Sequence, residues 1–163
     1  MPSILILNGA SCAGKTTAAA LLAQTLDEAR WIHPDGIWSD TPVIAPEMLL
    51  DRALNEIAST NEPLILVDCQ IRPRSVHGLL TDHDLEHWTS VLMDCPDSIR
   101  NERMAARGWT DDFGPMTQWA ELLRRETRAL GHPVLDSSAM SPSAIANRIH
   151  QHIKALDWPS ACL

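Results

Sequence analysis

A glycine-rich loop near the start of the chain carries the residue types that phosphate binding requires. After the apolar run Ser3–Asn8, the segment Gly9–Thr16 (GASCAGKT) matches the pattern G-x-x-x-x-G-K-[ST] at every fixed position. Glycines in such a loop let backbone N–H groups point inward, and the N-terminus of a following helix favours an anion. The loop is therefore predicted to bind ATP through Gly9, Ala10, Ser11, Cys12, Ala13, Gly14, Lys15, Thr16 and Thr17.

Three side chains are expected to add charge and metal chemistry to this loop. Lys15 is predicted to reach the β and γ phosphates as a catalytic residue, and Thr16 to bind the cofactor Mg²⁺. Asp68 ends the apolar strand "LILVD". Because ligands gather at the carboxyl ends of parallel strands, Asp68 is predicted to hold Mg²⁺, through water, or to orient the attacking group. A helix cap or turn is the structural alternative for Asp68.

Apolar runs alternate with helical patterns along the whole chain. Strands are expected at Ser3–Asn8, Trp31–His33, Pro63–Cys69, Ser90–Asp94 and 132–138. Helices are expected at Thr16–Leu26, Pro46–Ser59, Asp82–Trp88, from Pro96 onward, at Thr117–Leu130 and at Pro142–Leu156. This alternation predicts a single α/β domain, a doubly wound parallel sheet with helices on both faces. The polar segment 108–118, punctuated by glycine and proline, is the candidate lid.

Composition and charge exclude several classes of protein. The 163 residues carry a formal charge of −8, which argues against a broad nucleic-acid-binding face. No apolar run is long enough to predict a membrane span. The four cysteines and the scattered histidines show no metal-ligand spacing. With no signal peptide expected, the cysteines are interpreted as reduced thiols of a cytoplasmic protein. The protein is expected to be a monomer or a homodimer.

The chain resembles the small kinases of the nucleoside monophosphate kinase superfamily. The resemblance rests on the loop Gly9–Thr16, on "LILVD" and on "CPDSIRNERMAARG", which is similar to the segment leading into the lid of these kinases. The opening "ILILNGASCAGKTT" is most similar to the chloramphenicol phosphotransferase-like branch. The resemblance implies a three-layer P-loop kinase fold with strand order 2-3-1-4-5, a short lid, and ATP-dependent phosphotransfer.

The resemblance also gives a role to Asp35, in "HPDGIW". The branch carries an aspartate after its second strand, thought to act as base on a substrate hydroxyl. Independently, Asp35 follows a short strand just before the expected acceptor pocket, where it could accept the hydroxyl proton. An ordinary Pro-Asp-Gly turn is the alternative. Trp38, close by, and Trp109, in the lid, are predicted to stack on a ring-shaped acceptor, with plain packing as the alternative.

Two groups of arginines are candidates for binding the nucleotide. Arg100, Arg103 and Arg107 recur at helical spacing on one side of a helix. The resemblance favours Arg103 as an ATP ligand and Arg107 as a catalytic residue, against the alternative of a solvated helix face. One arginine of the next helix is expected to close onto the γ phosphate, with the choice open between Arg124, Arg125 and Arg128.

The sequence is compatible with more than one kind of acceptor. The expected acceptor region, residues 34–63, has a single arginine, Arg52, and six acidic residues. This balance favours a neutral or cationic alcohol such as an antibiotic, nucleoside or sugar. Arg72 and Arg74, however, follow the third strand and are candidate ligands of an acceptor that already carries a phosphate, as in a nucleoside monophosphate kinase. A non-catalytic ATP-binding module is the third possibility.

Overall fold

The computed structural model describes residues 2–26, 29–33, 45–57, 63–110 and 112–156. Within these residues five parallel strands form one sheet in the order β2-β3-β1-β4-β5. The strands are β1 (Ser3–Asn8), β2 (Ala29–Ile32), β3 (Leu64–Cys69), β4 (Trp88–Asp94) and β5 (Val134–Asp136). The predicted fold class and strand order are confirmed.

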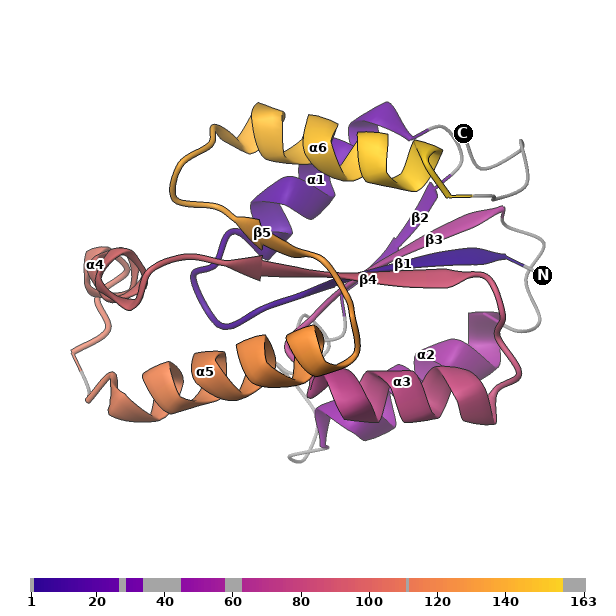
Figure 1. Ribbon diagram of the computed structural model, residues 1–163, viewed down its shortest axis with the longest axis horizontal. Coiled ribbons are helices and arrows are strands. Elements are labelled where there is room, and N and C mark those ends of the chain that lie inside the picture. Colours follow the sequence, from indigo (N-terminus) through magenta and orange to yellow (C-terminus); the bar gives the residue numbers. More distant parts are fainter. Residues whose placement is uncertain (1, 27–28, 34–44, 58–62, 111, 157–163) are drawn as a thin grey trace.

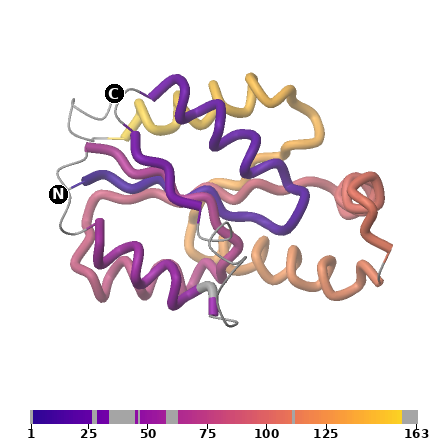
Figure 2. The backbone as a smooth tube through the Cα atoms, turned by 180° about the vertical axis from the view of Figure 1, so that it is seen from behind, coloured from indigo at the N-terminus to yellow at the C-terminus, as the bar shows by residue number. Residues whose placement is uncertain are grey.

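Helices cover both faces of this sheet (Figure 1). In Figures 1 and 2, α1 (Lys15–Thr25) and α6 (Pro142–Lys154) lie together on one face, and α2 (Pro46–Ile57), α3 (Pro73–Asp82) and α5 (Gly114–Ala129) lie on the other. The short helix α4 (Asp97–Ala106) stands beyond the carboxyl end of β4. None of the described helices combines the length and the apolar character that crossing a membrane requires.

The position of the central strand β1, between helices on both faces of the sheet, explains why its sequence is continuously apolar. Its alternate residues Leu5 and Leu7 belong to the core beneath α1 and α6. Ile4 and Ile6 belong to the opposite core, beneath α2 and α3. Because successive side chains of a strand point to opposite faces, a strand covered on both sides must be apolar at every position.

One predicted helix is in the wrong place. The sequence analysis expected a helix at Asp82–Trp88, but α3 spans Pro73–Asp82 and β4 already begins at Trp88. Pro73 occupies the first turn of α3, where the missing N–H of proline costs nothing, and Val76 and Leu80 bury its inner face. The chain then turns sharply, with Asp84 in a left-handed conformation. The other predicted helices and strands are present with slightly shifted ends.

The sheet order places the phosphate loop after the central strand, where the chain's connections run to strands on opposite sides of β1. β1 lies between β3 and β4, and the loop leaves its carboxyl end. Ligands in such sheets bind at this end. Of the candidate lid, residues 114–118 form the start of α5, and the described residues 108–110 and 112–113 lie between α4 and α5.

Candidate active site

The phosphate loop follows a backbone path that requires glycine at both fixed positions of the motif. A Cβ atom on Gly9 would stand 2.4 Å from the carbonyl oxygen of Met93 in β4. Gly14 is the N-cap of α1 and has a φ of 93°, a left-handed conformation that disfavours other residues. The local sequence therefore sets both the shape of the loop and the start of the helix that follows.

The Lys15 side chain is held within this loop. The residue is buried, and its Nζ donates a hydrogen bond to the carbonyl oxygen of Ala10 at 3.2 Å. Thr16 and Thr17, on the first turn of α1, are exposed. The loop thus combines an ammonium group, exposed hydroxyls and a helix N-terminus, which together suit an anion.

Asn8 fixes the loop to the segment that follows β3. Its Oδ1 accepts hydrogen bonds from the N–H groups of Gly9, at 2.8 Å, and Ile71, at 3.3 Å. Its Nδ2 donates to the carbonyl oxygen of Ile71. The sequence analysis gave Asn8 no role, although a polar residue ending a buried apolar strand was a usable signal. Asn8 couples the phosphate loop to the residues after β3.

A cavity of about 340 Å³ opens beside the loop, between α1, α4 and the connection from β5 to α6. Arg103 of α4 donates to the carbonyl oxygen of Cys12 at 3.2 Å and to Oγ and the carbonyl oxygen of Ser137, at 3.2 and 3.1 Å. Apolar side chains of Met140 and Ile145 form part of the wall. The cavity offers an apolar surface bounded by an arginine, which suits a flat heterocycle.

A second cavity, of about 170 Å³, lies against the phosphate loop itself and shares Cys12, Gly14 and Thr17 with the first. Arg107 lines both cavities, and Gln70 and Trp109 line this one. Ser11 Oγ donates to Gln70 Oε1 at 3.0 Å. The structure therefore brings together the predicted residues Lys15, Thr16, Arg107 and Trp109, and adds Gln70, which the sequence analysis did not single out.

His33 also lines this second cavity, although the sequence analysis gave it no role. It follows β2 directly, and its Nδ1 lies 3.2 Å from Oδ2 of Asp68, whose side chain is fully buried. Asp68 itself does not line the cavity. The position of His33 at a strand's carboxyl end was the available signal, and the structure adds its contact with Asp68.

Arg72 and Arg74, the candidate ligands of a phosphorylated acceptor, meet the buried Glu126 of α5. Arg72 donates to Glu126 Oε1 through Nη2 and, at 3.1 Å, through Nε, and the Arg74 N–H donates to Oε2 at 3.3 Å. Burial acts to raise the pKa of Glu126, but these hydrogen bonds and charges outweigh it and hold that pKa below its usual range. Neither arginine lines the two cavities beside the loop.

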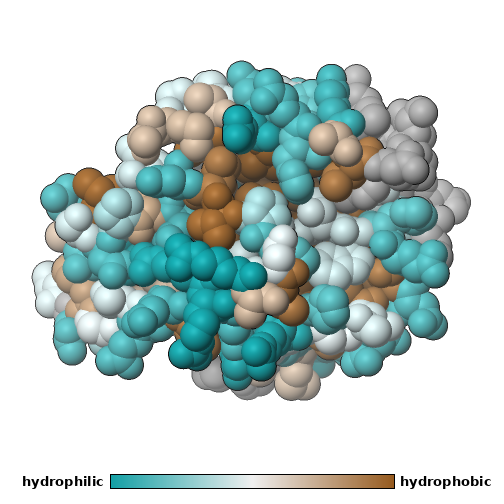
Figure 3. Space-filling view, viewed as in Figure 1, coloured by the Kyte–Doolittle hydropathy of each residue, from teal (hydrophilic) through white to brown (hydrophobic). Residues whose placement is uncertain are grey.

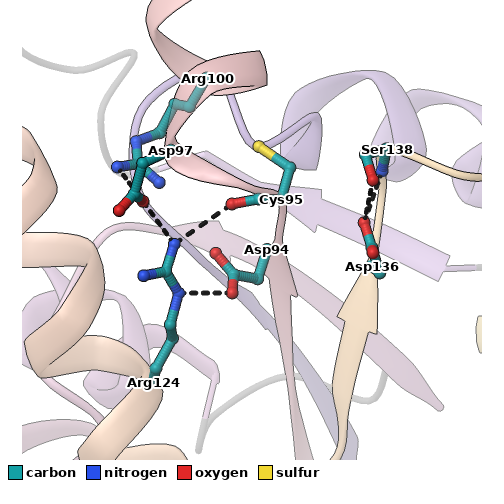
Figure 4. A network of polar contacts seen from close by, with 7 residues as sticks. All are labelled: Asp94, Cys95, Asp97, Arg100, Arg124, Asp136 and Ser138. Atoms are coloured by element: carbon teal, nitrogen blue, oxygen red, sulfur yellow. Dashed lines mark hydrogen bonds and ion pairs between the residues drawn. The ribbon is translucent and has the colours of Figure 1, made fainter.

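Arg124 of α5 is held by two carboxylates, Asp94 at the end of β4 and Asp97 at the start of α4 (Figure 4). Its Nε donates to Asp94 Oδ2 and its Nη2 to Asp97 Oδ1, both at 2.6 Å, and Nη2 also donates to the carbonyl oxygen of Cys95 at 3.2 Å. The hydrogen bond from Arg124 lowers the pKa of Asp97. Arg100 is fully buried and donates to the same Asp97 oxygen at 2.7 Å.

The side chains of α5 border a third cavity, of about 900 Å³, beside the sheet edge. Hydrophilic side chains gather over α5 and the neighbouring strand ends in Figure 3. The exposed Arg125 and Arg128 line this cavity together with Arg124. No residue of the phosphate loop lines it. The three arginines of α5 therefore lie apart from the two cavities at the loop.

Asp35 and Trp38, the predicted base and one predicted acceptor ligand, lie outside the described residues. His33, the last described residue before them, lines the smaller cavity. Their roles stay predictions.

Solved structures with the same fold include several small-molecule kinases. The tunicamycin resistance protein of Deinococcus radiodurans is 19% identical, with a TM-score of 0.71 over 98% of this chain and 99% of that one. A gluconokinase from Sinorhizobium meliloti is 17% identical, with a TM-score of 0.64 over 94% and 92%. Shikimate kinase from Acinetobacter baumannii, in complex with shikimate, is 18% identical, with a TM-score of 0.66 over 95% and 94%.

The family model described as "AAA domain" matches residues 5–114. A search of curated proteins gave no significant match. The matched segment begins in β1 and contains the phosphate loop, β3, β4 and α4, which carry most of the site described above. Because the match covers more than half of the chain, the protein belongs to this AAA domain family of phosphate-loop proteins.

Proposed function

We propose that the protein is an ATP-dependent phosphotransferase that moves the γ phosphoryl group of ATP to a hydroxyl of a small molecule. The observation that carries the proposal is the arrangement of two cavities around one phosphate loop, with Arg107 in the wall of both. The smaller cavity extends from the loop residues that would hold the phosphates to His33, Gln70 and Trp109, so an acceptor bound there would lie next to the transferred group.

The cavity of about 340 Å³, the larger of the two beside the phosphate loop, is the proposed site of the adenine base. Its apolar wall, formed in part by Met140 and Ile145, and the fixed guanidinium of Arg103 suit a flat heterocycle. From there the phosphates would run along Gly9–Thr16. Lys15 would exchange its bond with the Ala10 carbonyl for the β and γ phosphates, and so stabilise charge on the transferred group.

Thr16 and Asp68 are the proposed residues for Mg²⁺. The Thr16 hydroxyl is exposed at the smaller cavity and fits a direct ligand. Asp68 is fully buried behind His33 and fits a role through water rather than direct coordination. Bound Mg²⁺ would neutralise charge on the β and γ phosphates.

The smaller cavity is the proposed acceptor site. Its polar residues His33 and Gln70 and the half-exposed ring of Trp109 suit a neutral, ring-shaped alcohol. In the proposed reaction a bond forms between the acceptor oxygen and the γ phosphorus. The bond from that phosphorus to the oxygen bridging to the β phosphate breaks, and the hydroxyl proton passes to Asp35.

The state of Arg72 favours this acceptor over one that is already phosphorylated. An arginine that binds an acceptor phosphate must present its guanidinium to the acceptor site, and that of Arg72 is bound to Glu126. The gluconokinase and the shikimate kinase with the same fold also support a small-molecule acceptor. We place the reaction in the cytoplasm, in line with Cys12, Cys69 and Cys95 as free thiols.

The test is ATP consumption by the purified protein with a panel of acceptors. The panel spans nucleosides, nucleoside monophosphates, sugars and hydroxylated antibiotics, and mass spectrometry detects the added phosphate. Phosphorylation of a neutral or cationic alcohol is the expected result. Activity confined to nucleoside monophosphates would replace the proposal with a nucleotide kinase, and ATP binding without transfer to any acceptor would indicate a binding module.

A further inference from the structure

Gln70 is tied to the phosphate loop through its side chain and through the main chain beside it. Ser11 Oγ donates a hydrogen bond to Gln70 Oε1 at 3.0 Å. Asn8 accepts a hydrogen bond from the N–H of Ile71, at 3.3 Å, and donates one to the Ile71 carbonyl oxygen. The loop therefore fixes both the position of Gln70 and the direction of its amide, which would otherwise lose side-chain entropy on binding a ligand.

The bond to Gln70 uses the only donor of the Ser11 side chain. A hydroxyl has a single O–H group, and that of Ser11 is directed at Gln70 Oε1. The phosphate oxygens of ATP accept hydrogen bonds, so this hydroxyl has no proton left to donate to them. Loops of this kind hold phosphates through backbone N–H groups. The side chain of Ser11 is therefore free to serve another part of the site.

The free end of the Gln70 amide belongs to the proposed acceptor site. Ser11 and Gln70 both line the smaller cavity, together with Lys15 and Trp109, and neither lines the cavity proposed for adenine. With Oε1 bound to Ser11, the amide N–H groups of Gln70 have no partner among the residues that the structure describes. They are the donors that Gln70 offers to a ligand in this cavity.

We propose that the amide N–H groups of Gln70 bind the acceptor, and that Ser11, although it belongs to the phosphate loop, is the positioning residue that holds this amide. The inference rests on the proposed function and deepens it, because it adds a requirement on the substrate. Beside the hydroxyl that is phosphorylated, the acceptor carries an oxygen that accepts a hydrogen bond, as in a second hydroxyl, an ether or a carbonyl group.

The first test compares the KM for an acceptor that is phosphorylated in the panel with the affinity for a non-hydrolysable ATP analogue, measured by calorimetry. Gln70→Met removes the amide and should raise this KM about 10-fold. Ser11→Ala releases the amide and should raise it about 3-fold, whereas Ser11→Thr keeps the hydroxyl and should restore it. ATP affinity should stay unchanged in all three variants. Gln24→Met, at an exposed glutamine of α1, is the matched control.

The second test shows whether the two side chains act as one unit. If Ser11 acts only through the amide, the double variant Ser11→Ala/Gln70→Met should have the same KM as Gln70→Met alone. Gln70→Glu keeps an oxygen for the Ser11 hydroxyl but has no N–H, so it should raise the KM at least as much as Gln70→Met. A KM for Gln70→Glu close to that of the unmodified protein would overturn the assignment of Gln70 as a donor.

The outcomes separate this inference from the proposed function. Weaker ATP binding with an unchanged acceptor KM in Ser11→Ala and Gln70→Met, or additive losses in the double variant, would overturn the inference and leave the phosphotransferase proposal intact. The absence of transfer to every acceptor would contradict the proposed function, and this inference with it.

Discussion

Replacing Arg124 by methionine tests whether this arginine stabilises the fold or binds the nucleotide. The sequence analysis left Arg124 among the residues that could close onto the γ phosphate. The structure instead joins it to Asp94, Asp97 and the carbonyl oxygen of Cys95 (Figure 4). Arg124→Met keeps most of the side chain's length and removes the three hydrogen bonds, so we expect it to lower stability without changing ATP affinity.

The size of the effect follows from the exposure of the three groups. Hydrogen bonds to charged groups contribute about 1.5–3 kcal/mol when they are well shielded, and exposed ion pairs contribute about 0.2–1 kcal/mol. Arg124 and Asp94 are each 18% exposed and Asp97 is 37% exposed, so the contacts fall between these limits. We expect Arg124→Met to cost about 2–3 kcal/mol, or about 5–10 °C in the unfolding midpoint for a chain of this size.

Thermal and urea unfolding measure the loss, and binding of a fluorescent ATP analogue measures affinity. Arg125→Met, at an exposed neighbour on the same helix, is the matched control and should stay within about 0.5 kcal/mol of the unmodified protein. If Arg124→Met left stability unchanged but weakened ATP binding or abolished transfer, the structural assignment of Arg124 would be wrong.

The stability that Arg124→Met loses should depend on pH. The hydrogen bond from Arg124 lowers the pKa of Asp97 in the folded protein. The contribution of Asp97 is therefore complete above its unfolded pKa of about 3.9. It is lost as the pH falls through the folded value. The stability difference between the unmodified protein and Arg124→Met should be constant near neutral pH and shrink below about pH 4. A difference that stayed constant down to pH 2 would contradict the pairing.

Three further variants test the phosphate loop and the proposed base. Lys15→Ala should lower phosphoryl transfer about 10³-fold with the fold intact by circular dichroism, and retained transfer would exclude the assigned role. Asp35→Asn should lower kcat about 10²-fold with little change in ATP affinity; an unchanged kcat would remove Asp35 as base. Gly9→Ala should cost about 1–3 kcal/mol in urea unfolding, because its Cβ would meet the Met93 carbonyl oxygen at 2.4 Å; unchanged stability would show that the loop can shift.

Local patterns were sufficient for the parts of the protein that depend on neighbouring residues. The unbroken apolar run of β1, the spacing of Gly9, Gly14, Lys15 and Thr16, and the alternation of strands and helices predicted the fold and the phosphate loop. The misplaced helix shows where local patterns fail. Apolar residues spaced for a helix occur on both sides of Asp82, and packing of Val76 and Leu80 beneath the sheet decides that the helix precedes it.

The tertiary structure alone decided which side chains of the site meet. Arg72 lies 54 residues from its partner Glu126, and Arg103 lies 34 residues from Ser137. The pairing of His33 with Asp68 likewise requires β2 to lie next to β3. The sequence by itself determined the phosphate loop, because backbone conformation and helix polarity are local. The partners of charged side chains depend on strand order and on how helices cross the sheet, so only the folded chain fixes them.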